Sequence, residues 1–304
     1  MKIRTVLGDI DANTLGISTC HEHLIWQVPN APHADPDLGF DSIPAAVAEM
    51  RYFKQAGGQA LVEMTTSEIG RAPLDLQQIS QATEIHVIAA SGHHKDKFSA
   101  SALQGQSVDE IAEGIFNDIT YGMDGTNIRA GIIKAASSNN EITEMEQRII
   151  TAAAIAHRET GAPVSTHTEG GTFAVEQATM LVQNSIAPEK ILIGHLDRNL
   201  PMETYIKLAN LGVYLGFDQI GKEKYWPDQE RVSLISEMIK AGFGNRILLS
   251  CDCARKSSWH THNPRVKGPS YLLMKFVPML RQANITENYI QQLLLENPAR
   301  FLAI

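Results

Sequence analysis

The chain has 304 residues, of which 43% are hydrophobic and 20% charged, and its formal net charge is −8. This size allows a large core, and the negative charge argues against a nucleic-acid partner, whose phosphates favour a basic face. No apolar run approaches the roughly 18 residues of a membrane span, and residues 1–9 lack a signal-peptide core, so we expect a cytoplasmic protein. The three cysteines, Cys20, Cys251 and Cys253, are expected to be free thiols.

Short apolar runs rich in β-branched residues alternate with longer amphipathic segments along the whole chain. The predicted strands are residues 17–23, 59–65, 84–90, 128–135, 163–168, 190–195, 212–217 and 246–251. The predicted helices are residues 43–56, 74–82, 108–118, 143–159, 173–185, 201–210, 229–241, 269–282 and 286–296.

Eight strands that alternate with helices predict parallel pairing through right-handed crossovers. Eight such units are the number that closes a barrel, so we predict an α/β fold, a (β/α)8 TIM barrel in which residues 1–304 form a single domain. The alternative is an open doubly wound sheet, which would be expected to carry a glycine-rich phosphate loop after an early strand. The sequence contains no such loop.

The carboxyl ends of the predicted strands carry an unusual set of polar side chains. Strand 1 ends in His21 and His23, which share one face of the strand because side chains alternate, and the later strands end in Lys134, His167, His195 and Asp252. Loops at these ends build the open face of a parallel barrel. Four imidazoles and a carboxylate suit zinc, cobalt, manganese or iron and exceed what one tetrahedral site needs, so two divalent ions would use them all.

Each of these residues also has a plainer interpretation. A His-x-His pair is common on strand surfaces, and a single histidine on an apolar strand, such as His167 or His195, is more often a hydrogen-bonded core residue. Lys134 should not remain an ammonium beside two divalent ions. When neutral it could react with carbon dioxide to form a carbamate, which is an anionic bridge. Alternatively, Lys134 pairs with Asp252 in a metal-free barrel.

The chain resembles the phosphotriesterase family of the amidohydrolase superfamily. That family carries His-x-His on strand 1, a carboxylated lysine on strand 4, histidines on strands 5 and 6, and an aspartate on strand 8. The resemblance covers nearly the whole chain, from residues 5–8 to residues 296–301, and residues 216–222 are similar to the branch of phosphotriesterase homology proteins. Some members of that branch carry Glu on strand 4, whereas this chain keeps Lys134.

The resemblance implies a binuclear metal-dependent hydrolase. It assigns His21, His23 and Asp252 to the more buried metal ion, His167 and His195 to the more exposed one, and the carbamate of Lys134 to the bridge between them. Zinc is the expected metal, with manganese, cobalt or iron as alternatives. A metal-bound hydroxide would attack the substrate, and Asp252 would accept its proton and pass it to the leaving group.

The loops after strands 7 and 8 are basic in an otherwise acidic protein. Their candidate substrate-binding residues are Lys222, Lys224, Arg255, Lys256, Arg265, Lys267 and Tyr271. This corner of a barrel is a frequent phosphate-binding position, so we expect a small anionic substrate, although lysines in a polar loop are often merely solvated. Acyl-homoserine lactonases of the family show Tyr after strand 3 and Arg after the strand 7 Asp. This chain has His93-His94 and Gln219 there, which argues against a long-acyl lactone.

The leading hypothesis is a lactonase for a small phosphorylated sugar lactone, and the second is hydrolysis of a phosphotriester or other phosphoester by the same centre. A binding or regulatory protein with a silent centre belongs to a different class, but no ligand of the family pattern is missing. A mononuclear deaminase would not require Lys134. Barrels of this kind often form homodimers, although the sequence shows no decisive apolar patch.

Overall fold

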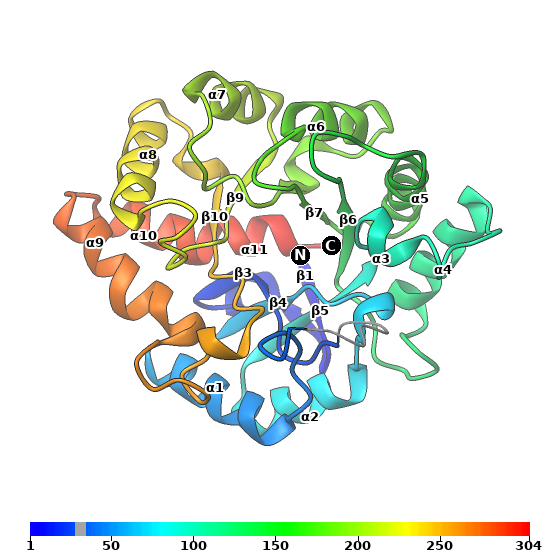
Figure 1. The fold of residues 1–304 in the computed structure, drawn as a ribbon, viewed down its shortest axis with the longest axis horizontal. Coiled ribbons are helices and arrows are strands. Elements are labelled where there is room, and N and C mark those ends of the chain that lie inside the picture. Colours follow the sequence, from blue (N-terminus) through cyan, green and yellow to red (C-terminus); the bar gives the residue numbers. More distant parts are fainter. Residues whose placement is uncertain (28–34) are drawn as a thin grey trace.

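The computed structural model describes residues 1–27 and 35–304 and contains a parallel sheet of eight strands in the order β10-β9-β8-β7-β6-β5-β4-β3 (Figure 1). The strands are β3 (Ser18–Glu22), β4 (Ala60–Glu63), β5 (His86–Gly92), β6 (Ile132–Ala136), β7 (Val164–His167), β8 (Ile191–Ile193), β9 (Tyr214–Phe217) and β10 (Ile247–Leu249). Every predicted strand is present and lies beside its sequence neighbour, which confirms the predicted TIM barrel.

Helices surround the sheet (Figure 1). They are α1 (Ile43–Gln55), α2 (Pro73–Thr83), α3 (Asp96–Ser99), α4 (Val108–Thr120), α5 (Glu144–Thr160), α6 (Ala174–Gln183), α7 (Met202–Leu211), α8 (Asp228–Lys240), α9 (Val277–Gln282), α10 (Glu287–Gln291) and α11 (Asn297–Leu302). Capping boxes at Ser107 and Thr143 fix the starts of α4 and α5, because each side chain exchanges hydrogen bonds with a glutamate three residues later. The predicted helix 269–282 includes a wide π-helical stretch, Leu272–Phe276, before α9.

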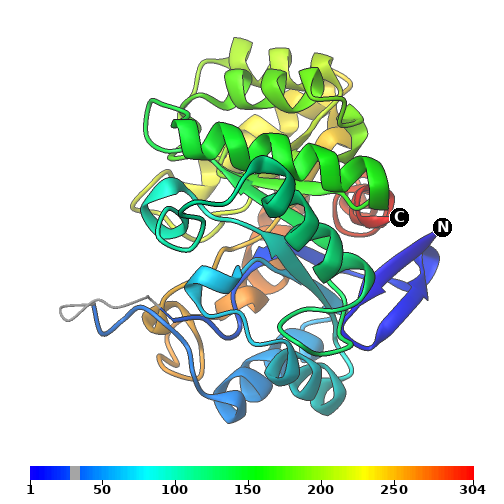
Figure 2. The ribbon, with the colours of Figure 1, turned by 90° about the vertical axis from the view of Figure 1, so that its right-hand side faces the viewer.

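One end of the barrel is closed by elements that the sequence analysis did not predict. An antiparallel hairpin of β1 (Lys2–Thr5) and β2 (Gly8–Asp11) lies beside α11 at this end (Figure 2). The two termini are joined there, because the N–H of Ile304 donates to the carbonyl of Lys2 at 2.8 Å. Ile3 and Phe301 belong to one buried apolar cluster with residues that point into the barrel. We call this end the base, and the opposite end, where the strands finish, the rim.

The first and last strands of the barrel are joined through side chains. The hydroxyl of Ser250 accepts the N–H of His21 at 3.0 Å, and the N–H of Asp252 donates to the carbonyl of His21 at 3.2 Å. The buried carboxylate of Glu22 accepts the N–H groups of Cys251 and Cys253, both at 2.9 Å. Glu22 therefore points away from the two flanking histidines, as the alternation of side chains along a strand predicts. Its hydrogen bonds help to close the barrel.

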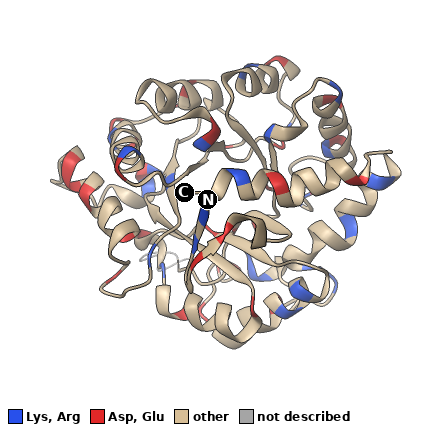
Figure 3. Ribbon diagram, turned by 180° about the vertical axis from the view of Figure 1, so that it is seen from behind, with Lys and Arg blue, Asp and Glu red and all other residues tan. Residues whose placement is uncertain are grey.

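Charged residues of both signs are spread over the outer helices on the side that carries the termini (Figure 3). Across residues 1–27 and 35–304, the helices are all too short or too polar to cross a membrane. Cys20, Cys251 and Cys253 are buried and free, as the sequence predicted.

Candidate metal centre

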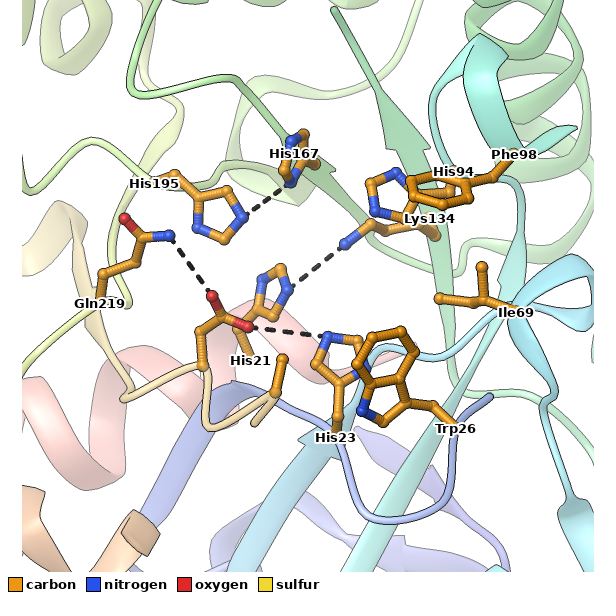
Figure 4. Close-up of a pocket in the computed structure, with 12 residues that line it drawn as sticks. His21, His23, Trp26, Ile69, His94, Phe98, Lys134, His167, His195 and Gln219 are labelled. Atoms are coloured by element: carbon orange, nitrogen blue, oxygen red, sulfur yellow. Dashed lines mark hydrogen bonds and ion pairs between the residues drawn. The ribbon is translucent and has the colours of Figure 1, made fainter. Parts of the chain in front are cut away.

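The six predicted metal ligands converge on one cavity at the rim, which we call the central cavity (Figure 4). It has a volume of about 180 Å³ and is lined by His21, His23, Trp26, Ile69, His94, Phe98, Lys134, His167, His195, Gln219, Asp252 and Ala254. One detail of the sequence analysis was wrong: Lys134 lies in the middle of β6, with two further strand residues after it. The strand continues because its ladder to β7 runs to the pair Ala136 and His167.

A buried aspartate at the end of β9 orients two of the histidines. Oδ1 of Asp218 accepts the N–H of His195 at 2.9 Å and lies 2.8 Å from Nδ1 of the same residue. Its other oxygen lies 3.4 Å from Nδ1 of His21. When His195 donates from Nδ1, the lone pair of its Nε2 is left free and directed into the cavity. A carboxylate behind an imidazole in this way is the usual means of fixing the tautomer of a metal ligand.

A hydroxyl and a buried glutamate orient His23 in a similar way. Nδ1 of His23 lies 2.9 Å from the hydroxyl of Thr65, which in turn donates to the carboxylate of Glu63 at 2.6 Å. Because the hydroxyl proton is used on Glu63, Thr65 must accept from His23, so Nε2 of His23 carries the free lone pair. That nitrogen lies 3.7 Å from Oδ1 of Asp252.

His167 completes the set of imidazoles. Its Nδ1 lies 2.8 Å from Nε2 of His195, and the two rings are nearly perpendicular at 4.6 Å between centroids. Its Nε2 lies 3.4 Å from the carboxylate of Glu169. The nitrogen that faces His195 is therefore the one available for a ligand shared with that residue.

The protonation states suit metal binding. Burial lowers the pKa of His21 to about 4 and the pKa of His23 and His167 well below the usual value, so these rings are neutral at pH 7. Nδ1 of His21 and Oδ2 of Asp218 lie 3.4 Å apart and are buried, and within residues 1–27 and 35–304 neither atom has a well-aligned hydrogen-bond partner. Two groups place their ligand atoms within 4.8 Å of one another, namely His21, His23 and Asp252, and His21, His195 and Asp218. Neutral imidazoles and carboxylates at this spacing fit divalent cations.

Two lysines reach this centre, one beside an imidazole and the other beside a carboxylate. Nζ of Lys134 lies 3.4 Å from Nε2 of His21, and burial lowers the pKa of Lys134 to about 8. Lys222, in contrast, pairs directly with Oδ2 of Asp252. Burial alone would raise the pKa of Asp252, but Lys222 and the nearby imidazoles outweigh it and hold that pKa below the usual range. Among the residues described, the ion-pair partner of Asp252 is thus Lys222, which corrects the alternative that assigned this pair to Lys134.

Sequence reasoning missed several residues of the site. Asp218 follows the apolar strand β9 as Asp252 follows β10, so the strand-end rule could have found it. His94, Trp26 and Phe98 form one wall of the central cavity. Nδ1 of His94 accepts the N–H of Lys95 at 2.7 Å, so a neutral His94 carries its proton on Nε2. No short-range pattern predicts this wall, because its members come from two separate segments, one that follows β3 and one that follows β5 and includes α3.

The predicted substrate-binding residues divide between two further cavities. Lys222, Lys224 and Arg255 line the rim cavity, which has a volume of about 490 Å³ and shares Gln219, Asp252 and Ala254 with the central cavity. Arg265, Lys267 and Tyr271 line a different one, the outer cavity, with a volume of about 220 Å³. Lys222 lines this cavity too, whereas Lys256 lines neither of them.

The chain is similar to known proteins in both sequence and structure. The sequence model described as the phosphotriesterase family matches residues 1–302. The chain is 33% identical to the phosphotriesterase homology protein of Escherichia coli strain K12, over 94% of this chain and 97% of that one. It is 32% identical to a phospho-furanose lactonase of Mycoplasmopsis synoviae, over 99% and 91%. The crystal structure of a lactonase from Listeria monocytogenes superimposes with a TM-score of 0.93 at 32% identity and covers 99% of both chains.

Proposed function

This chain belongs to the phosphotriesterase family, and from that membership we propose that it is a metal-dependent lactonase acting on a small phosphorylated sugar lactone. One observation carries the proposal: a rim cavity with three cationic side chains shares Gln219, Asp252 and Ala254 with the cavity that collects the four imidazoles. A phosphate held by the cations would leave the lactone ring beside Asp252.

The proposed metal ligands are those that the resemblance to the family implies, and the convergence of their side chains on the central cavity supports them. His21, His23 and Asp252 would hold one ion, His167 and His195 a second, and Lys134 as a carbamate would contact both. Zinc is the proposed metal, and imidazole and carboxylate ligands also suit manganese, cobalt and iron. Bound ions of this kind lower the pKa of water and polarise a carbonyl oxygen, which is the chemistry that ester hydrolysis requires.

Asp252 would move the proton during the reaction. Its two oxygens face different partners, because Oδ1 is directed toward His23 while Oδ2 contacts Lys222 and lies 3.4 Å from the amide nitrogen of Gln219. Oδ1 of Asp252 can therefore serve as a metal ligand while Lys222 and Gln219, which line the rim cavity, hold Oδ2 in place. The ionised carboxylate of Asp252 would accept the proton of the attacking water and deliver it to the ring oxygen that is released as an alkoxide when the acyl C–O bond of the lactone breaks.

The rim cavity would bind the phosphate group. Lys222 is half-buried, and desolvation would lower its pKa, but Asp252 outweighs that effect and keeps Lys222 charged. Arg255 is braced by Asp35 and Asp37, with its Nη1 at 2.6 Å from Asp35. Both ion pairs are made through Nη1 of Arg255, which lines the cavity, and the planar guanidinium of Arg is well suited to phosphate.

The test is a pH-indicator hydrolysis screen of the metal-loaded protein, after its bound metal has been counted. We expect two metal ions per chain and faster turnover of sugar lactones that carry a terminal phosphate than of the same lactones without it. A phosphotriester serves as the second substrate class. Two metal ions with activity on the triester alone would refute the lactonase proposal and favour the phosphoesterase alternative.

Arg255→Ala separates the phosphate contact from the chemistry. The variant should raise KM for a phosphorylated lactone by about tenfold while changing little for the uncharged analogue, because a charge-assisted hydrogen bond is lost. The matched control is Lys207→Ala, which removes one exposed cation from α7. Equal losses on both lactones would refute the proposed phosphate contact.

A further inference from the structure

The outer cavity is a second basic cavity, and apart from the shared Lys222 the proposed reaction does not use its cations. Its polar wall is formed by Lys222, Arg265, Lys267 and Lys275, and its floor by Ile220, Cys251, Cys253 and Val266. Tyr271 packs against Gly221, where an added Cβ would lie 3.1 Å from the ring, so a glycine is needed at this contact. The cavity shares Gly221, Lys222 and Ser258 with the rim cavity, but none of the six proposed metal ligands lines it.

The charge of this cavity is unbalanced. Four cations line it, and its lining includes no aspartate or glutamate. Within residues 1–27 and 35–304, Arg265, Lys267 and Lys275 take part in none of the ion pairs, whereas Lys222 and Arg255 each have a carboxylate partner. Asp228 lies next to Tyr271 but is already neutralised by Arg231 at 2.7 Å. Cations gathered around one space repel one another unless an anion joins them.

Hydrogen-bond donors are also available in this space. The ammonium of the half-buried Lys222 has three N–H donors, and Asp252 occupies one of them. Arg265 adds a planar fork of donors, which matches the oxygens of phosphate. The half-buried Lys267 faces the same space from the next turn of the loop. This set suits an oxyanion with several acceptors better than a single carboxylate.

We propose that the outer cavity is a second anion-binding site, which takes phosphate or the phosphate group of a small phosphomonoester. The site is distinct from the rim cavity, because Arg265, Lys267 and Lys275 belong to the outer cavity while Lys224 and Arg255 belong to the rim cavity. The inference does not depend on the lactonase assignment, since it concerns binding and not turnover.

Equilibrium dialysis of the metal-loaded full chain against radiolabelled inorganic phosphate at low salt tests this site. The double variant Arg265→Ala/Lys267→Ala should lose one class of phosphate site, or weaken it by about tenfold or more, because two charge-assisted contacts are removed. Arg255→Ala should retain that class. Lys207→Ala/Lys240→Ala removes the same total charge from the exposed surfaces of α7 and α8 and should bind as the wild type does.

Three outcomes would overturn the proposal. Unchanged binding by Arg265→Ala/Lys267→Ala would show that the outer cavity takes no phosphate. An equal loss in Lys207→Ala/Lys240→Ala would show a diffuse effect of net charge, and loss of the same class in Arg255→Ala would show one shared site. Competition with ribose 5-phosphate distinguishes free phosphate from a phosphomonoester as the preferred ligand. A lactonase assay that fails while the dialysis succeeds would remove the proposed function and leave this site.

Discussion

The rim and the base of this barrel are built from the same eight strands but are organised in opposite ways. At the base, Ile3 and Phe301 pack with other apolar side chains, and the termini close the end of the barrel. At the rim, buried polar groups are held by hydrogen bonds and ion pairs with other polar groups. Two residues there, His195 and Asp252, have positive φ values of 60° and 47°. Such left-handed backbone is disfavoured for residues with a side chain and persists when surrounding contacts impose it. The base is therefore closed by apolar packing, whereas the rim gathers the polar groups of the candidate site.

The largest expected effect comes from Lys134→Ala at the rim. Loss of the proposed bridging ligand should remove metal and reduce turnover to the uncatalysed rate, roughly a million-fold or more for a typical enzyme. Metal analysis and the lactone assay measure both effects, and circular dichroism should show a folded barrel. A Lys134→Ala protein that keeps two metal ions and full activity would contradict the bridging role.

Phe301→Ala tests the base. Its ring is fully buried and lies 5.3 Å from the ring of Tyr214 in an edge-to-face contact. Removing it should lower the free energy of unfolding by about 3–5 kcal/mol because a cavity is left. Denaturant titration measures this loss. The folded variant should still bind two metal ions, and a reduced metal content at low denaturant would show that the two ends are not independent.

Asp218→Asn tests the support behind the imidazoles. The amide keeps the shape of the side chain but loses the negative charge that holds His195. Metal affinity should fall by about 10–100-fold, the usual effect of removing such a partner. Competition with a fluorescent chelator measures it. The matched control is Asp109→Asn, an exposed carboxylate in the first turn of α4, which should leave metal affinity unchanged.

The smallest effect is expected at Thr65. Thr65→Val removes the hydroxyl that accepts the N–H of His23 and should weaken metal binding by about tenfold, at the low end for this kind of support. Thr65→Ser keeps the hydroxyl and should bind nearly as the wild type does. Equal losses in the two variants would mean that packing of the methyl group, and not the hydrogen bond, supports His23.

Much of this architecture could be predicted from the sequence, because its signals are local. Apolar runs of strand length and amphipathic segments identified all eight strands and most helices. The strand ends then identified His21, His23, His167, His195 and Asp252 as one set, since parallel strands bring their carboxyl ends to one rim. The hairpin of β1 and β2 was missed because residues 2–11 are short, partly polar and bounded by no strong turn signal other than Gly8.

The remaining features depend on contacts between distant segments. Asp218 supports His195 because β9 lies next to β8, and no spacing within either strand reveals this. The basic residues after β10 divide between two cavities because the chain from Arg255 to Tyr271 winds through short turns that carry no hydrophobic period. Lys222 pairs with Asp252 across two loops. Each of these contacts joins segments that are distant in the sequence.

The hydrogen bonds between β3 and the residues that follow β10 also determine when the site can form during synthesis of the chain. His21 and Ser250 are 229 positions apart, so the amino-terminal ligands leave the ribosome about 10–50 s before their carboxylate partner at ordinary elongation rates. A nascent chain presents His21 and His23 without Asp252 for all of that time. Contacts of such long range are slow to form, so barrel closure and completion of the buried ligand trio become a single late event. Metal binding by the proposed trio would therefore be a late step in the formation of the protein.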